Sequence, residues 1–181
     1  MENVFDYTIE KAGLDDLDTV LYLLKDASKW LKTKDLQQWD YYLTDMEGNL
    51  KEISDSIKKG STYLLFMENR AVGTLTLENS PNEWDCELWG SDADEDVCMY
   101  LHRLVVDREW RGKGLGDICL DWAESYCQEN GYEKIRFDCL HSNKRLNQYY
   151  QRRFPLKETV HIHGVHNKYE KIVAEPRKSG D

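Results

Sequence analysis

The sequence predicts an α/β protein built on a mixed sheet of six or seven mostly antiparallel strands, with helices on both faces. Segments with the period of a strand alternate along the chain with segments that have the period of a helix. An apolar strand, a glycine-rich turn and an amphipathic helix follow one another within residues 100–132. The length of 181 residues suits a single core, so we expect one domain over residues 1–175 and a disordered tail over 176–181.

The first half of the chain is expected to form a strand, two helices and a strand pair. These elements are a strand over 4–10, helices over 15–31 and 48–59, and strands over 61–67 and 71–78. The first helix begins with Asp15 and Asp18 and carries a stripe of leucines, and the second helix ends at Gly60. Residues 30–39, with tryptophan at both ends, are expected to form a polar connection between the two helices.

The second half is expected to form a strand, a helix, a strand, a short helix and a final antiparallel pair. These elements are a strand ending at Val106, a helix from Gly116 to Gly131, a strand over 134–140, a helix over 143–154, and strands over 156–162 and 167–173. Within the strand at 134–140, Ile135 and Phe137 are expected to share one face. The complete order is therefore β-α-α-β-β-β-α-β-α-β-β.

The turn between the central strand and its helix reads Arg-Gly-Lys-Gly-Leu-Gly from Arg111 to Gly116. A helix start leaves four backbone N–H groups without intrahelical partners, and glycines let an anion approach them. The spacing excludes the phosphate loop of nucleoside triphosphatases, because Gly114 rather than Ser or Thr follows Lys113. A dinucleotide fingerprint is excluded as well, because Asp117 stands where its third glycine would be. We expect the turn to bind another phosphate-bearing ligand.

Arg111, Gly114 and Gly116 match the Arg/Gln-x-x-Gly-x-Gly/Ala turn of the GCN5-related N-acetyltransferase family, after a strand that ends in Leu-x-Val. The sequence resembles that family. The resemblance implies the acyl-CoA N-acyltransferase fold and acetyl-coenzyme A as co-substrate. By the same resemblance, the pyrophosphate would be bound by Arg111, Gly112, Lys113, Gly114, Leu115 and Gly116. The pantetheine arm would be bound by the backbone of Leu104, Val105 and Val106.

A second motif of the family, on the short helix, is matched by Asn143, Leu146, Tyr149 and Phe154. The resemblance implies that Asn143 contacts the pantetheine arm and that Tyr149, as the catalytic acid, protonates the departing thiolate. A tyrosine suits this role because its pKa near 10 keeps it protonated at neutral pH. The neighbouring Tyr150 is the alternative. Arg153 departs from the family pattern, which usually has glycine there.

The expected function is transfer of the acetyl group of acetyl-coenzyme A to a primary amine of a small molecule, by direct attack in a ternary complex. The alternatives are a peptide or protein N-acetyltransferase and a non-catalytic regulator that binds coenzyme A. An alkylamine is mostly protonated at pH 7, so a base must assist. The candidates for this base are Glu83, Glu87, Asp96, His102 and water.

Residues 78–96 contain no lysine or arginine. Their eight carboxylates belong to Glu78, Glu83, Asp85, Glu87, Asp92, Asp94, Glu95 and Asp96. One interpretation is a solvated acidic loop whose two tryptophans fill its base. The other is a loop that attracts an amine and lines its pocket, and both can hold together.

Composition excludes several other classes of protein. A net charge of −10 argues against a nucleic-acid surface, and no apolar run is long enough for a membrane span. The five cysteines are widely spaced, which predicts neither disulfides nor a zinc site. His161, His163 and His166 are interpreted as a solvated strand face rather than as metal ligands. We therefore expect a cytoplasmic protein. A homodimer is common in the family that it resembles, but the oligomeric state stays open.

Overall fold

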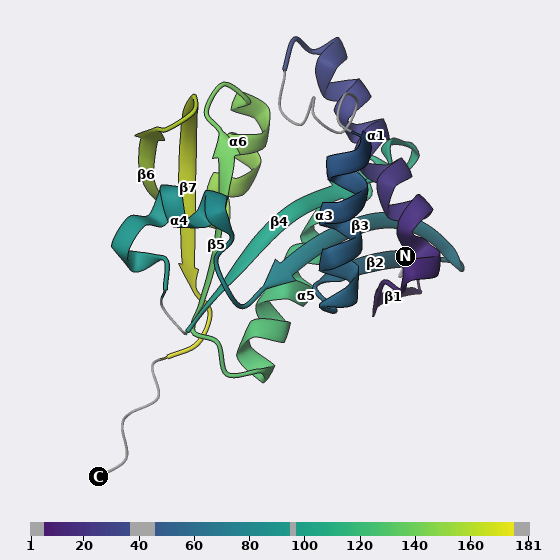
Figure 1. Ribbon diagram of the computed structural model, residues 1–181, viewed down its shortest axis with the longest axis horizontal. Helices are drawn as coiled ribbons and strands as arrows, with labels where there is room; N and C mark the ends of the chain where they lie inside the picture. Colours follow the sequence, from purple (N-terminus) through teal and green to yellow (C-terminus); the bar gives the residue numbers. More distant parts are fainter. Residues whose placement is uncertain (1–5, 37–45, 95–96, 176–181) are drawn as a thin grey trace. The chain divides into compact units, whose positions relative to one another are not determined.

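The structure, a computed structural model, describes residues 6–36, 46–94 and 97–175. Its strands are β1 (Tyr7–Lys11), β2 (Thr62–Met67), β3 (Arg70–Glu78), β4 (Cys98–Val106), β5 (Lys134–Leu140), β6 (Leu156–His161) and β7 (Val165–Ile172). Its helices are α1 (Leu17–Thr33), α3 (Met46–Lys58), α4 (Glu83–Trp89), α5 (Leu115–Glu129) and α6 (Lys144–Gln151), with 3-10 turns η1 (Leu14–Asp16), η2 (Gly90–Asp92) and η3 (Arg108–Trp110). Within the described residues, seven strands form one sheet in the order β1-β2-β3-β4-β5-β7-β6 (Figure 1), which confirms the predicted strand number.

The chain divides into two compact units. The first consists of residues 1–77 and 102–120, and the second of residues 78–101 and 121–181. β4 and α5 contribute residues to both units. Each unit has its own buried apolar cluster, so each can be described by itself.

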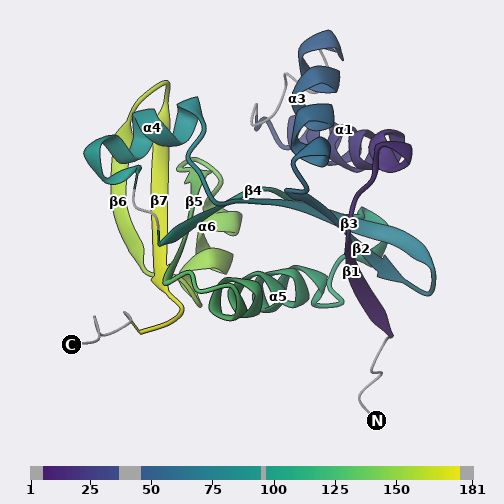
Figure 2. The ribbon, with the colours of Figure 1, turned by 60° about the horizontal axis from the view of Figure 1, so that its bottom comes forward.

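In the first unit, β1, β2 and β3 pair antiparallel in sequence order. Glu68 and Asn69 form the two-residue turn between β2 and β3, with φ of +50° and +65°, as tight hairpins of this kind require. α1 and α3 lie on the same side of these strands (Figure 2). Their buried side chains form the core with β2 and β4. This cluster includes Val20, Leu21, Leu24, Ile53, Ile57, Leu64 and Val105.

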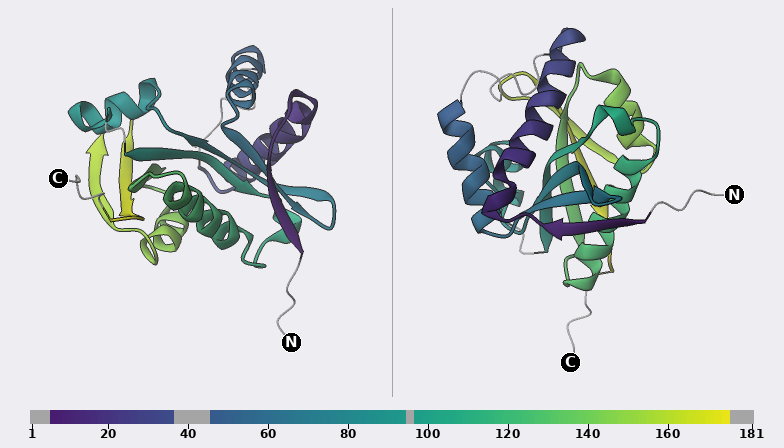
Figure 3. Two further views of the ribbon diagram at one scale, coloured as in Figure 1. Left: turned by 90° about the horizontal axis from the view of Figure 1, so that it is seen from below. Right: turned by 90° about the vertical axis from the view of Figure 1, so that its right-hand side faces the viewer.

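In the second unit, β5 pairs antiparallel with β7, and β7 pairs antiparallel with β6. The first residues of β4 pair in parallel with Lys134–Arg136 of β5. α4 covers one face of these strands and α6 covers the other (Figures 2 and 3). Phe137 faces α6, where its ring centre lies 4.6 Å from that of Tyr150. Asp138, the next residue along the strand, faces α4 and accepts a hydrogen bond from Trp84 Nε1 at 3.1 Å.

α4 and η2 correct the prediction that residues 78–96 form a loop. Asn82 Oδ1 accepts a hydrogen bond from the Asp85 N–H at 2.8 Å, and Asp85 Oδ2 accepts one from the Asn82 N–H at 3.1 Å. This reciprocal pair caps the helix start. Leu88 and Trp89 are buried on the sheet side of the helix, so the apolar residues of this run belong to a core rather than to the base of a loop.

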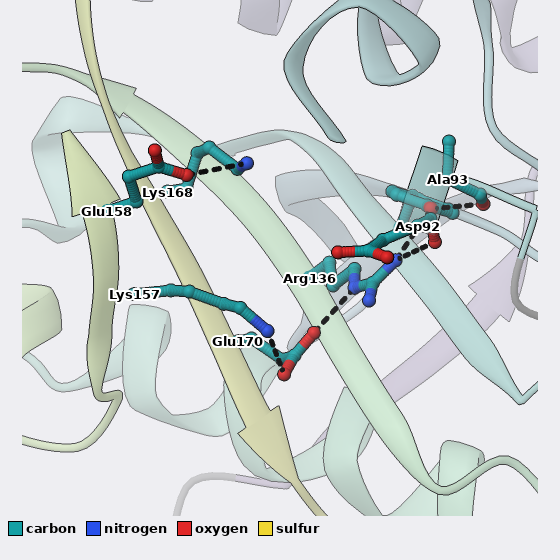
Figure 4. A network of polar contacts seen from close by, with 8 residues as sticks. Asp92, Ala93, Arg136, Lys157, Glu158, Lys168 and Glu170 are labelled. Atoms are coloured by element: carbon teal, nitrogen blue, oxygen red, sulfur yellow. Dashed lines mark hydrogen bonds and ion pairs between the residues drawn. The ribbon is translucent and has the colours of Figure 1, made fainter. Parts of the chain in front are cut away.

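Arg136 of β5 is fully buried and holds the segment that follows α4 onto the sheet (Figure 4). Its Nη1 donates to the carbonyl oxygen of Asp92 at 2.8 Å and to Tyr100 Oη at 3.1 Å. Its Nε donates to Glu170 Oε2 at 2.7 Å, and its guanidinium carbon lies 4.3 Å from the centre of the Trp89 ring. A buried charge is costly unless it is paired in this way. The contacts with Glu170, Asp92 and Trp89 therefore offset the burial of Arg136, and they hold the end of α4 and η2 against β5.

One smaller expectation also changes, and others concern residues that the structure does not describe. Trp30 lies inside α1, which continues to Thr33, so the predicted polar connection cannot begin at residue 30. Trp39, Asp96 and the tail from residue 176 lie outside the described residues. The remaining predicted elements are confirmed within a few residues, and the strand over 134–140 matches β5 at both ends.

Candidate active site

β4 changes its backbone conformation at Arg103. Arg103 has φ +52°, in the left-handed region that residues other than glycine rarely adopt. The strand that continues beyond it lies very close to β3. The carbonyl oxygen of Val105 is 3.1 Å from the point where a Cβ on Gly73 would sit, which explains why β3 has a glycine there.

The main-chain groups at the end of β4 point alternately to its two edges. The N–H of Asp107 donates to the carbonyl oxygen of Val72 in β3 at 2.7 Å. Because alternate residues of a strand face the same edge, Val105 also directs its main-chain groups toward β3. Leu104 and Val106 therefore direct their N–H and C=O groups to the opposite edge, where they can bind an extended ligand.

η3 connects β4 to the glycine turn and is held by acidic side chains. Asp107 Oδ1 accepts a hydrogen bond from the Glu109 N–H at 3.0 Å, which caps the turn. Arg70 Nη2 lies 2.9 Å from Glu109 Oε2 and 3.5 Å from Asp107 Oδ2. Arg108 stacks over Trp30 of α1, at 5.4 Å from the ring centre. These contacts fix the direction in which the chain enters the turn at Arg111.

Two glycines of the turn have left-handed backbones with open space beside them. Gly112 has φ +78° and Gly114 has φ +75°, and no heavy atom of the described chain lies within 4 Å of the Cβ position at either residue. The carbonyl oxygen of Gly114 accepts a hydrogen bond from the N–H of Ile118 at 3.2 Å, so α5 begins directly after this glycine.

The composition of the turn fits a pyrophosphate. Arg111 and Lys113 are exposed cations, and the ammonium group of Lys113 lies 4.5 Å from the centre of the Trp110 ring. Leu115 is buried, so its side chain anchors the first turn of α5 while its N–H belongs to the positive end of the helix. The glycines at this helix start leave open space that side chains would fill, and two cations lie beside it. This arrangement is typical of phosphate-binding sites.

In the second unit, Asn143 lies directly before α6. Its Oδ1 accepts a hydrogen bond from the Leu146 N–H at 3.2 Å, so part of its role is to cap the helix.

One turn later, the buried Asn147 forms several hydrogen bonds that the sequence did not predict. Its Nδ2 donates to the carbonyl oxygen of Leu140 at 2.9 Å, and its Oδ1 accepts from Tyr169 Oη at 2.6 Å. Asn147 thereby ties α6 to β5 and β7.

The adjacent Tyr149 and Tyr150 have different environments. Tyr150 is 7% exposed and packs against the rings of Phe137 and Tyr169, with centres 4.6 and 5.8 Å away. Burial strongly raises the pKa of Tyr150, so it serves as a core residue. Tyr149 is partly exposed and has the guanidinium of Arg152 at 5.5 Å from its ring centre. Of the two side chains, that of Tyr149 is the more exposed.

Arg153, which replaces the usual glycine of the second motif, is accounted for by local contacts. Its Nη2 lies 2.7 Å from Asp121 Oδ1 and 2.9 Å from Glu124 Oε2, both on α5. Phe154 beside it is buried, with its ring perpendicular to that of Phe137 at 4.9 Å. Where the family usually has a glycine, this chain has an arginine that binds the end of α6 to α5 through ion pairs.

The candidate bases and the histidines have different surroundings. Glu83 is exposed, and Glu87 Oε2 lies 2.9 Å from His163 Nε2. His102 is partly buried in β4. His166 Nδ1 lies 3.5 Å from Asp138 Oδ2, and the interaction with this carboxylate raises the pKa of His166. Two of the three histidines thus face carboxylates rather than solvent alone.

The cysteine side chains are free thiols, and four of the five are buried. No disulfide joins the five cysteines, all of which lie in the described part of the chain. Burial raises the pKa of Cys119, Cys127 and Cys139 to about 12, so these thiols are inert core groups. Among the residues that the structure describes, no group of three or more His, Cys, Asp or Glu side chains could hold a metal ion. The described helices also include none that is long and apolar enough to cross a membrane.

The mixed sheet and the strand, glycine turn and helix at its centre define an acyl-CoA N-acyltransferase fold. The sequence matches the Acetyltransferase (GNAT) family over residues 25–154, so the chain belongs to that family. It is therefore an acyltransferase that uses acetyl-coenzyme A as co-substrate.

Individual proteins show the similarity in sequence and in structure. The chain is 33% identical over 141 residues to the uncharacterised N-acetyltransferase YesJ of Bacillus subtilis (strain 168), covering 78% of this chain and 77% of that protein. A GNAT acetyltransferase of Listeria monocytogenes 4b F2365 has a similar structure, with a TM-score of 0.79, 28% identity and coverage of 95% and 98% of the two chains. The PaiA N-acetyltransferase of Thermoplasma acidophilum, solved in complex with coenzyme A, has a TM-score of 0.72 at 16% identity, covering 92% and 99%.

Proposed function

We propose that the chain transfers the acetyl group of acetyl-coenzyme A to a primary amine of a small molecule, by direct attack within a ternary complex in the cytoplasm. The observation that carries the proposal is the pair of left-handed glycines, Gly112 and Gly114, with open space beside them at the start of α5. The similar fold of the Thermoplasma acidophilum protein solved with coenzyme A supports it. We also propose that residues 1–175 act as one catalytic domain, and that a homodimer is one form of the protein.

The coenzyme is held by two sets of groups on this proposal. The pyrophosphate binds to Arg111, Gly112, Lys113, Gly114, Leu115 and Gly116, mainly through N–H groups and the two cations. The pantetheine arm binds to the outward-facing main chain of Leu104 and Val106 and to Asn143. Val105 contributes its buried side chain, which keeps this part of β4 against the core of the first unit.

Bound acetyl-coenzyme A supplies an activated acetyl thioester. The chain's own groups then act on the charges that the reaction develops. A main-chain N–H of Leu104 or Val106 donates a hydrogen bond to the carbonyl oxygen as negative charge grows on it. Tyr149 gives its Oη proton to the sulfur as the carbon–sulfur bond breaks. Because the acceptor amine must lose a proton, Glu83, Glu87, Asp96, His102 or water serves as the base.

The acceptor is expected to be a cationic small molecule. The chain carries a net charge of −10, and α4 presents exposed Glu83 and Glu87. A negative surface raises the local concentration of positively charged amines, and this effect weakens with added salt.

An acetylation screen tests the proposal. Polyamines, aminoglycosides, amino acids and short peptides are incubated with the protein and acetyl-coenzyme A, and products are identified by mass spectrometry. We expect a small amine to be acetylated fastest, with kcat/KM falling as salt rises. Preferential acetylation of peptide N-termini or lysines would favour a peptide N-acetyltransferase instead.

A further inference from the structure

An ion pair joins α3 to the point where β4 changes conformation. Nη2 of Arg103 donates to Oε1 of Glu52, which lies in the middle of α3. The side chain of Arg103 is 12% exposed and that of Glu52 is 52% exposed, so the guanidinium is largely withdrawn from water. Because one of its two charges is largely shielded from water, this pair is screened less than a pair between two exposed side chains.

The conformation of Arg103 needs such support. A residue with a Cβ and φ +52° is strained, and it persists only where its surroundings determine it. A left-handed residue inside a strand also changes the direction of the N–H and C=O groups that follow. Those groups belong here to Leu104 and Val106. They point away from β3, because the hydrogen bond between Asp107 and Val72 lies on the other edge.

We propose that Glu52 is a positioning residue for acetyl transfer. By binding the side chain of Arg103, Glu52 holds the left-handed backbone at that residue and so aims the main-chain N–H groups of Leu104 and Val106 at the acetyl thioester. Glu52 itself touches neither the coenzyme nor the amine. The inference rests on the proposed function, because it concerns the same strand.

The first test compares two substitutions on α3. Glu52→Gln removes the charge that binds Arg103. Asp55→Asn is the matched control, because Asp55 forms an exposed ion pair with Lys51 on the same helix, at 2.9 Å. Misplacement of a catalytic group lowers the rate without removing the binding site, so we expect Glu52→Gln to lower kcat about tenfold or more. Its KM for acetyl-coenzyme A should stay within about twofold, because the phosphate-binding turn is untouched. Asp55→Asn should change neither value.

The second test separates the backbone from the side chain. Arg103→Gly and Arg103→Ala both remove the ion pair, but only glycine adopts φ +52° without a steric cost. We expect Arg103→Gly to retain a kcat several times higher than that of Arg103→Ala. Equal values would mean that the backbone conformation is irrelevant to the reaction.

The outcomes distinguish this inference from the proposed function. If wild-type protein acetylates no amine, the proposed function fails and the inference with it. If wild-type protein is active and Glu52→Gln keeps its kcat, the inference alone fails. An equal loss of kcat in Asp55→Asn would also overturn it, since the effect would then come from α3 in general. Thermal unfolding of all four variants checks that each is folded at the assay temperature.

Discussion

Replacing Gly114 by alanine tests the phosphate-binding turn. Gly114 has φ +75°, and within the described residues no heavy atom lies within 4 Å of the added methyl position. The unliganded protein therefore loses only the backbone preference of glycine, about 1–2 kcal/mol. For a chain of this size, each kcal/mol lowers Tm by about 2–4 °C.

The larger effect is expected on coenzyme binding. The methyl group would occupy the open space through which a phosphate approaches the N–H groups at the start of α5. Loss of one hydrogen bond to a charged group costs about 1.5–3 kcal/mol. This cost corresponds to a Kd for coenzyme A that is roughly 10- to 150-fold weaker.

Gly60→Ala is the matched control for this prediction. Gly60 has φ +72° and follows α3 in the same unit, and the nearest atom to its added methyl group is Lys11 Nζ at an ordinary 3.5 Å. It should lose similar stability and keep the wild-type affinity for coenzyme A. Calorimetric titration with coenzyme A and thermal unfolding measure the two quantities. Wild-type affinity in Gly114→Ala, with Tm lowered as in Gly60→Ala, would refute the assignment of the turn.

Two further predictions concern the second unit. Tyr149→Phe should lower kcat by about 100-fold at unchanged KM for acetyl-coenzyme A, whereas Tyr150→Phe should stay near the wild-type rate. Steady-state kinetics measure both values. A larger loss of kcat in Tyr150→Phe would mean that Tyr150, not Tyr149, is the catalytic acid. The Asp138 carboxylate, 3.5 Å from His166 Nδ1, raises the pKa of His166. Its contribution to stability is therefore fully present below the unfolded histidine pKa of about 6.5, and it is lost as the pH rises through the higher folded-state pKa. Asp138→Asn should accordingly lower Tm more at pH 5.5 than at pH 9, and equal losses at both would contradict this linkage.

Local patterns in the sequence were sufficient to predict most of the fold. The alternation of apolar residues predicted both ends of β5 correctly. The left-handed glycine at residue 131 follows the end of α5, as predicted. α4 was missed because its carboxylates were interpreted as a solvated loop. The signal was present, since Asn82 and Asp85 have the spacing of a capping pair and the apolar residues after them recur at helical intervals.

The features that sequence could not predict depend on contacts between distant residues. Glu52 and Arg103 are 51 residues apart, and no local pattern pairs them. The same holds for the buried Arg136, whose carboxylate partner lies 34 residues away. The different environments of the adjacent Tyr149 and Tyr150 are likewise visible only in three dimensions, because they depend on what packs against each ring.

On the proposed mechanism, the chain transfers an acetyl group directly from acetyl-coenzyme A to a primary amine. The most direct measurement follows acetylated amine and free coenzyme A thiol together, by mass spectrometry and thiol titration, and examines the mass of the protein in the absence of amine. We predict equal amounts of the two products and an unmodified protein. A lack of acetylated product with every amine tested, or an acetylated protein that forms without amine, would contradict the claim.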